Sequence, residues 1–255
     1  MGKGALHNKP SMSVRHDGRS ADEIRPYSFT PDFARNATGS VLAVCGRTQV
    51  ICAATIQEEV PRWMKVQGVT GGWITAEYSM LPYSTLDRKP RDISKGRLDG
   101  RSVEIQRLIG RAMRAVVDLD KLGQRTLTID CDVLRADGGT RTTAITGAYI
   151  AVARAIRRLQ SEGTLKETVN PIKTQVAAVS VGVVGGRVLV DLDYEEDRSA
   201  AVDANVVMTS EGKFVEMQAA GEESVFSQEE LLGLVDGARN ALGKLFELQR
   251  EAVLY

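Results

Sequence analysis

The sequence has almost no histidine. His7 and His16 are the only two histidines in 255 residues, and both lie within the first 20. A mechanism that depends on a histidine base in the protein core is therefore excluded. A zinc site built from histidine and cysteine is not expected either, because the three cysteines lack metal-ligand spacing.

Cysteine and long hydrophobic runs are also scarce. Cys45, Cys52 and Cys131 lie in apolar, strand-like segments, so we expect them to be small buried side chains in a reducing, cytoplasmic environment. No hydrophobic run approaches the 18 residues that suggest a membrane span. The first 20 residues carry charge but no hydrophobic signal region. We expect residues 1–14 to form an N-terminal extension and no membrane contact.

Neither sign of charge dominates, but the charges are unevenly distributed. Lys and Arg number 33, as do Asp and Glu. Residues 1–190 hold 28 basic and 18 acidic residues, whereas residues 191–255 hold 5 and 15. The basic part is expected to attract a polyanion, and the acidic part a divalent cation or a basic neighbour. Within one fold the two parts could also neutralise each other.

One segment has the pattern of a strand, a glycine turn and a helix. Apolar residues alternate over 127–133 and recur at helical spacing from Ile145 onward. Between them, Gly138 and Gly139 let the backbone approach an anion, and a helix N-terminus offers unpaired N–H groups. Thr140 adds a hydroxyl and Arg141 a guanidinium suited to phosphate. This pattern favours a phosphate site, although an ordinary connector with Thr140 as N-cap has the same appearance. The dinucleotide motif G-x-G-x-x-G and the P-loop motif are both missing.

Hydrophobic periodicity predicts strands and helices in both parts of the chain. Each half contains several strands and a long helix, which is a hint of duplication. The predicted elements are a hairpin over 40–56, a strand over 73–80, a polar loop over 81–100, a helix through 105–116, strands over 174–184, 187–194, 202–208 and 213–219, and a C-terminal helix.

The acidic residues gather in one short segment. Asp191-Leu192-Asp193-Tyr194-Glu195-Glu196-Asp197 is followed six residues later by Asp203. Such carboxylates repel one another unless a cation or arginines compensate. Asp197 and Asp203 could meet and hold Mg²⁺ or Mn²⁺, or the segment could be an acidic surface turn. A rival pair, Asp130 and Asp132, lies on one face of a strand and could bind metal in a hydrolytic nuclease, or accept local hydrogen bonds.

Basic residues gather in the loop at 81–100 and on the helix that follows. The loop contains Arg88, Lys89, Arg91, Lys95 and Arg97. These residues could guide a phosphodiester backbone electrostatically, or they could simply keep the protein soluble. The helix carries a stripe of three arginines, which we expect to be solvated and paired with Glu104: Arg107, Arg111 and Arg114.

Several of these segments together resemble the ribonuclease PH family, whose members trim tRNA 3′ ends phosphorolytically. The matching segments are 72–78 (GWITAEY), 100–111 (GRSVEIQRLIGR), 129–133 (IDCDV), 136–141 (ADGGTR) and 191–197 (DLDYEED). The resemblance extends from about Arg15 to the C-terminus. It implies a duplicated α+β fold of the ribosomal-protein-S5-domain-2 type, with halves at 15–160 and 172–255, and a homohexamer assembled as a trimer of dimers.

The resemblance also implies roles for individual residues. Phosphate would be bound by Arg101, Gly139, Thr140 and Arg141, the catalytic divalent metal by Asp197 and Asp203, and RNA by Arg88 and Arg91. The implied reaction is attack of inorganic phosphate on the 3′ end of tRNA precursors and other RNA, with release of nucleoside diphosphates. Phosphate is already anionic at neutral pH, so it needs capture and alignment rather than a strong base.

Two features bear on this expectation. A non-catalytic RNA-binding ring subunit is an alternative, but it is expected to have lost arginines or carboxylates at the implied positions, and all are present here. Tyr83, Leu86 and Asp87 stand where members of the family often carry Arg, His and Thr, so we expect tRNA affinity or orientation to differ.

Overall fold

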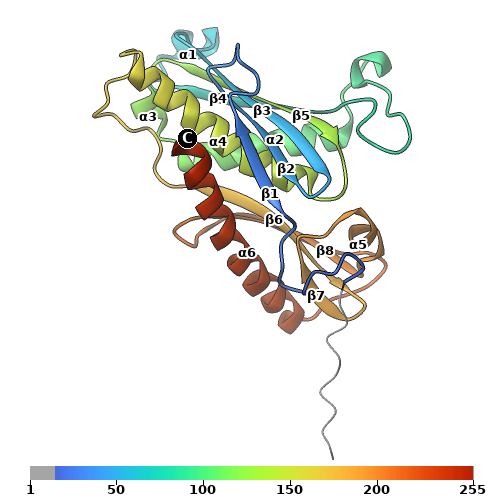
Figure 1. Cartoon of the computed structure of the whole chain (residues 1–255). Helices are drawn as coiled ribbons and strands as arrows, with labels where there is room; N and C mark the ends of the chain where they lie inside the picture. The colour runs from blue at the N-terminus through green and yellow to red at the C-terminus, as the bar shows by residue number, and fades with distance from the viewer. Residues whose placement is uncertain (1–14, 255) are drawn as a thin grey trace, which may run out of the picture.

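The computed structural model describes residues 15–254, so the predicted extension at 1–14 lies outside the described residues (Figure 1). Two β-sheets and six α-helices make up the described part, together with one short 3₁₀ helix. The predicted α+β class is confirmed. None of the helices in the described part is long and apolar enough to cross a membrane.

The first sheet has five strands in the order β1-β2-β3-β5-β4. Only the β4–β5 pair is parallel. Along β5, alternate residues from Leu127 to Val133 are buried in the core, while Asp130 and Asp132 point to the opposite, half-exposed face. The strands are β1 (Tyr27–Pro31), β2 (Gly39–Cys45), β3 (Thr48–Gln57), β4 (Trp73–Met80) and β5 (Thr126–Arg135).

Two long helices cover the inner face of this sheet. Helix α2 (Gly100–Val116) begins at Asp99, whose side chain accepts a hydrogen bond from the backbone of Arg101. Helix α4 (Thr140–Ser161) is buried over most of its length because it packs on β2 and β3 on one side and on β6 of the second sheet on the other. The smaller helices of this half are α1 (Arg62–Gln67), η1 (Asp92–Lys95) and α3 (Leu119–Leu122).

The second sheet has four antiparallel strands in the order β7-β6-β8-β9. Its central strand β6 is buried along nearly its whole length, since α4 covers one face and α6 the other. Figure 1 shows α6 running along this second half. The elements are β6 (Val176–Val184), β7 (Arg187–Val190), α5 (Tyr194–Ser199), β8 (Val202–Thr209), β9 (Phe214–Gly221) and α6 (Gln228–Leu254).

One predicted strand is wrong. The strand expected over 187–194 ends at Val190, and Tyr194 begins α5. Asp191 has a positive φ of 55°, which breaks the extended backbone. Asp193 then caps α5 by accepting hydrogen bonds from the backbone of Glu195 and Glu196. The other predicted strands and helices are present with small shifts at their ends.

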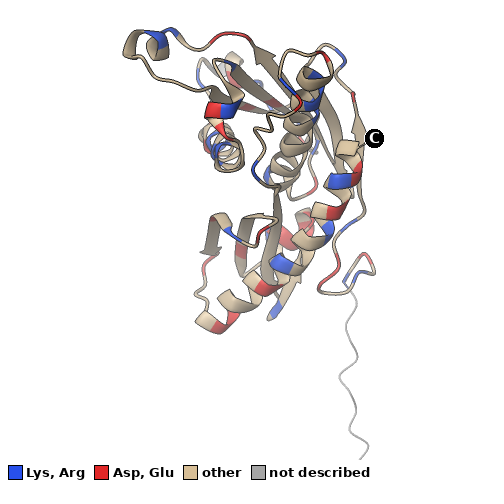
Figure 2. Cartoon of the chain, turned by 90° about the vertical axis from the view of Figure 1, so that its left-hand side faces the viewer, with Lys and Arg blue, Asp and Glu red and all other residues tan. Residues whose placement is uncertain are grey.

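The basic and acidic parts of the sequence meet inside the fold. Arg25 pairs with Asp191 at 2.6 Å between guanidinium nitrogen and carboxylate oxygen, and Arg111 pairs with Glu216 at the same distance. Figure 2 shows that α6 itself carries both acidic and basic residues. The neutralisation expected between the two parts is therefore present at these ion pairs.

Candidate active site

A cleft of about 910 Å³ opens where the two sheets meet, at the N-terminal ends of α2 and α4. The start of α5 and the start of β8 form its other wall. All six residues predicted to bind phosphate or metal line this cleft: Arg101, Gly139, Thr140, Arg141, Asp197 and Asp203. Segments far apart in the sequence thus bring cations and carboxylates together.

The glycine turn has a left-handed backbone that fixes the start of α4. Gly138 and Gly139 have φ values of 73° and 64°, and Gly139 is the N-cap of α4. The alternative in which Thr140 is the N-cap is wrong, because Thr140 is the first residue of the helix. A Cβ on Gly138 would lie 2.6 Å from the Leu192 carbonyl oxygen. Glycine is therefore required there for packing against the second half, and not only for access to an anion.

The Thr140 hydroxyl is oriented by Tyr78. The Tyr78 hydroxyl donates to Thr140 Oγ1 at 3.0 Å, and both residues are buried. Burial raises the pKa of Tyr78, so its phenol stays protonated and remains a donor. Since Thr140 accepts this bond, its own hydrogen is available to an anion in the cleft.

Arg101 and Arg141 supply the positive charge of the cleft by different means. Arg141 donates from Nη1 to Gln218 Oε1 at 2.9 Å and to Glu104 Oε1 at 3.2 Å, which holds its guanidinium in place. Glu104 was expected to pair with the arginine stripe of α2, and it contacts Arg141 instead. The side chain of Arg101 is exposed and makes no hydrogen bond or ion pair with any of the described residues, although its backbone N–H donates to Asp99. Its guanidinium is therefore free to bind an anion.

Asp197 and Asp203 are neighbours without a full set of partners. Burial first, and then the negative charge of Asp197, raise the pKa of Asp203 to about 6. Burial also raises the pKa of Asp197, while the charges of Arg101, Arg141 and Arg25 oppose the increase. Asp203 Oδ1 is buried and has no hydrogen-bond partner among the described residues. An orphaned carboxylate oxygen beside a second carboxylate fits a divalent cation.

Two other carboxylates of the acidic segment, Asp191 and Glu196, are paired with arginines from the start of the described chain. Arg15 Nε donates to Glu196 Oε1 at 2.6 Å, and Arg19 Nη2 lies 3.5 Å from Glu196 Oε2. Arg25 binds Asp191 through its backbone N–H, Nε and Nη2, and Asp191 is fully buried. The alternative of an acidic surface turn is therefore wrong for Asp191 and Glu196, which belong to a buried ion-pair network.

Arg25 also contacts the glycine turn that contains Gly138 and Gly139. Its Nη1 donates to the carbonyl oxygen of Asp137 at 2.6 Å. The Asp137 carboxylate in turn accepts from Arg47 Nε at 2.8 Å. Arg25 thus ties the glycine turn of the first half to Asp191 of the second. A segment rich in arginine at 15–25 was the only sequence signal for this connection.

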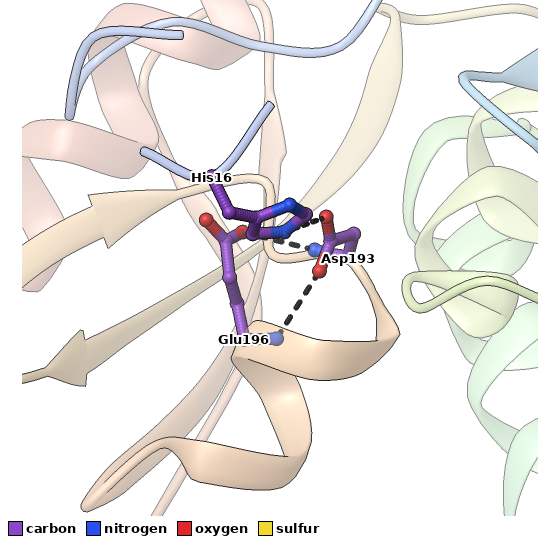
Figure 3. Close-up of side chains that lie close together, drawn as sticks. All are labelled: His16, Asp193 and Glu196. Carbon is purple, nitrogen blue, oxygen red and sulfur yellow. Dashed lines mark hydrogen bonds and ion pairs between the residues drawn. The ribbon is translucent and has the colours of Figure 1, made fainter. Parts of the chain in front are cut away.

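His16, Asp193 and Glu196 lie close enough together to be considered as a metal site (Figure 3). His16 Nε2 lies 2.7 Å from Asp193 Oδ2, while Asp193 Oδ1 caps α5. Glu196 Oε2 accepts from the Asp193 backbone at 3.2 Å and is paired with Arg15. Because arginines and backbone N–H groups already occupy these oxygens, the cluster supports α5 and is a poor cation site.

The remaining predicted residues lie outside the cleft wall. Asp130 and Asp132 lie on the outer face of the first sheet; burial and neighbouring carboxylates raise the pKa of Asp130. Their oxygens do not converge with a third ligand among the described residues. Burial raises the pKa of Asp132, and the charge of Arg91 opposes that increase. Arg88 and Arg91 are exposed in the loop between β4 and α2.

Comparison with known proteins identifies the class. Residues 23–157 match the family model "3′ exoribonuclease family, domain 1", and residues 174–241 match "3′ exoribonuclease family, domain 2". The chain belongs to the 3′ exoribonuclease family. The family expected from the sequence segments is therefore confirmed.

Individual relatives are similar over nearly the whole chain. Ribonuclease PH of Bacillus subtilis is 54% identical over 94% of this chain and 97% of its own length. Ribonuclease PH of Corynebacterium kroppenstedtii is 50% identical over 94% of this chain and 93% of its own length.

Solved structures support the fold. Rice Rrp46 has a TM-score of 0.75 at 20% identity, covering 94% of this chain and 100% of that one. The Archaeoglobus fulgidus exosome with RNA bound to the active site has a TM-score of 0.75 at 26% identity, covering 92% of each chain.

Proposed function

We propose that the chain is a phosphorolytic 3′-to-5′ exoribonuclease that trims the 3′ ends of tRNA precursors and other RNA. Inorganic phosphate is the co-substrate, and nucleoside diphosphates are released. The observation that carries the proposal is one cleft that joins a free arginine and a glycine turn to two neighbouring carboxylates with raised pKa values, one of which has an orphaned buried oxygen. Relatives named ribonuclease PH at 50–54% identity support the same activity.

Capture of phosphate is assigned to the N-terminal end of α4 and to Arg101. The free N–H groups at a helix start and the Thr140 hydroxyl donate to phosphate oxygens. Arg101 and Arg141 add charge-assisted hydrogen bonds. Together they hold the anion in line with the terminal phosphodiester. Their positive charge offsets the repulsion between the two anionic reactants, and binding aligns the attacking oxygen with the bond to be broken.

Asp197 and Asp203 are assigned to a divalent cation, Mg²⁺ or Mn²⁺. When bound, such a cation stabilises the negative charge that develops on the transferred phosphoryl group and on the departing 3′ oxygen. The protein's contribution is to hold both carboxylates at the cleft wall, Asp197 on a capped helix and Asp203 at the start of β8. The orphaned Asp203 Oδ1 and the raised pKa of Asp203 support this assignment.

RNA binding and assembly belong to the same proposal. Arg88 and Arg91 are exposed on the loop that borders the cleft, as an electrostatic guide for RNA requires. The Archaeoglobus exosome binds RNA at its active site, and its relationship to this chain supports RNA as the substrate.

A homohexamer arranged as a trimer of dimers is proposed from the resemblance. A cytoplasmic location is supported by three buried free cysteines.

The decisive experiment is incubation of a 3′-extended tRNA with Mg²⁺, with and without inorganic phosphate. Nucleoside diphosphates that form only with phosphate are expected. Nucleoside monophosphates formed without phosphate would contradict the proposal and favour hydrolysis at Asp130 and Asp132. Ultracentrifugation at micromolar concentration tests the ring, and a monomer alone would contradict it.

A further inference from the structure

Two large apolar side chains are exposed on the wall of the active-site cleft. Tyr83 is 68% exposed and Leu86 is 98% exposed, and both line the cleft. Single exposed apolar residues are common on protein surfaces. Here, however, they flank a cleft whose other lining residues include Arg47, Arg101 and Arg135. The exposed ring of Tyr83 therefore lines a cleft that also contains arginine side chains.

The turn that carries Tyr83 is hydrogen-bonded to the end of β5, the strand that leads into the glycine turn. The Leu81 N–H donates to the Val133 carbonyl oxygen at 3.1 Å, and the Ala136 N–H donates to the Ser84 carbonyl oxygen at 2.7 Å. Ser84 is 3% exposed, so the residue after Tyr83 is packed inside. The ring therefore extends from an anchored backbone and lines the same cleft as Gly138.

We infer that Tyr83 is a stacking platform for an unpaired nucleobase near the 3′ end of the RNA. Single-stranded nucleic acid is bound by aromatic rings beside cations, because the ring stacks on a base while the cations contact the backbone. Tyr83 supplies the ring and the cleft arginines supply the cations. Leu86 adds apolar surface at the edge of the same wall. This inference rests on the proposed function and adds a positioning residue for its substrate.

The loop chemistry agrees with stacking rather than charge as the role of this position. Tyr83, Leu86 and Asp87 are exposed residues of the cleft wall, and none of them carries a positive charge. A ring holds a base by its face and is tolerant of base identity. We therefore expect RNA binding at this position to depend weakly on salt, in contrast with binding by Arg88 and Arg91.

The test is steady-state phosphorolysis of a single-stranded oligoribonucleotide by Tyr83→Ala and Tyr83→Phe. The Ala variant should raise the KM for RNA about tenfold, with kcat and the KM for phosphate nearly unchanged. The Phe variant should restore the KM to within about twofold, because the ring is kept. Phe33→Ala is the matched control, since Phe33 is 47% exposed on the β1–β2 loop and does not line the cleft.

A substrate series with one abasic position near the 3′ end identifies the stacked base. The unchanged protein should lose about tenfold in affinity for one such substrate, and Tyr83→Ala should lose nothing further with it. An unchanged KM in Tyr83→Ala, or an equal loss with every abasic substrate, would overturn the inference. Fluorescence polarisation without phosphate measures binding apart from turnover. If the unchanged protein releases no nucleoside diphosphate, the proposed function fails instead.

Discussion

Two groups of carboxylates lie within a few residues of each other and have opposite surroundings. Asp191, Asp193 and Glu196 are buried, and each is bound by arginine, histidine or backbone N–H groups. Asp197 and Asp203 face the cleft, where Arg101 and Arg141 act only through their charge. The first group joins the two halves of the fold. In the second group, burial disfavours the charged forms of both carboxylates.

The difference separates acidic residues that stabilise the fold from acidic residues that remain able to bind a ligand. A buried carboxylate that is fully hydrogen-bonded has no capacity left for a ligand. A carboxylate with a raised pKa and an orphaned oxygen costs stability in the absence of a cation. Four substitutions test this distinction, from the largest expected effect to the smallest.

Asp197→Asn should lower the phosphorolysis rate by about a thousandfold while the protein remains folded. The amide keeps the shape but not the charge that a divalent cation requires. Rates are measured with saturating RNA and phosphate over a range of Mg²⁺ concentrations. Glu229→Gln on the exposed surface of α6 is the control. A rate within tenfold of the unchanged protein would remove Asp197 from the site.

Arg25→Met should destabilise the protein by about 3–5 kcal/mol, because Asp191 would keep a buried charge without its main partner. Urea unfolding measures the free energy. Arg154→Met is the control, since Arg154 pairs with an Asp32 side chain that is 68% exposed, and a loss below about 1 kcal/mol is expected. A similar loss of unfolding free energy in Arg25→Met and Arg154→Met would contradict a special structural role for the buried pair of Arg25 and Asp191.

Arg141→Ala should raise the KM for phosphate about 10- to 100-fold, which corresponds to the roughly 1.5–3 kcal/mol of a charge-assisted hydrogen bond. Its partner Glu104 is 47% exposed, so its loss should cost little stability. Initial rates against phosphate concentration give the KM, and thermal unfolding checks the fold. An unaltered KM for phosphate would exclude Arg141 from phosphate binding.

Asp203→Asn should make the metal-free protein more stable near pH 7.5, by on the order of 1–2 kcal/mol after allowance for partial exposure. The pKa of Asp203 rises from 3.8 to about 6 on folding. The folded chain therefore binds this proton more tightly, and the stability it contributes is complete below about pH 4 and is lost as pH rises through about 6. Unfolding in a chelator across pH 4–8 should show a steeper loss of stability with rising pH in the unchanged protein than in the variant, because other carboxylates with raised pKa values remain in both. Equal slopes would contradict the raised pKa.

Local patterns predicted most of the fold because strands and helices follow from periodicity within the segment itself. The hairpin at 40–56 and the helix from Thr140 are examples. The missed end of β7 depended on a single backbone angle at Asp191, which no periodicity records.

The site was only partly predictable from the residues. The glycine turn and Arg141 could be recognised from a strand–turn–helix pattern, and Arg101 only from the family resemblance. The sequence could not show which acidic residues are neutralised, because Arg25 lies 166 positions from Asp191. Pairing over such a distance is decided by packing of the two halves and not by local pattern.

The ion pair between Arg25 and Asp191 has a consequence for synthesis of the protein. A growing polypeptide emerges from its N-terminus, so the helix starts that would bind phosphate are made well before Asp197 and Asp203. Until Asp191 itself has been synthesised, the glycine turn lacks the partner in the later half to which Arg25 connects it. A copy that ends before Asp191 therefore carries the residues proposed to bind phosphate without either of the carboxylates proposed to bind the cation.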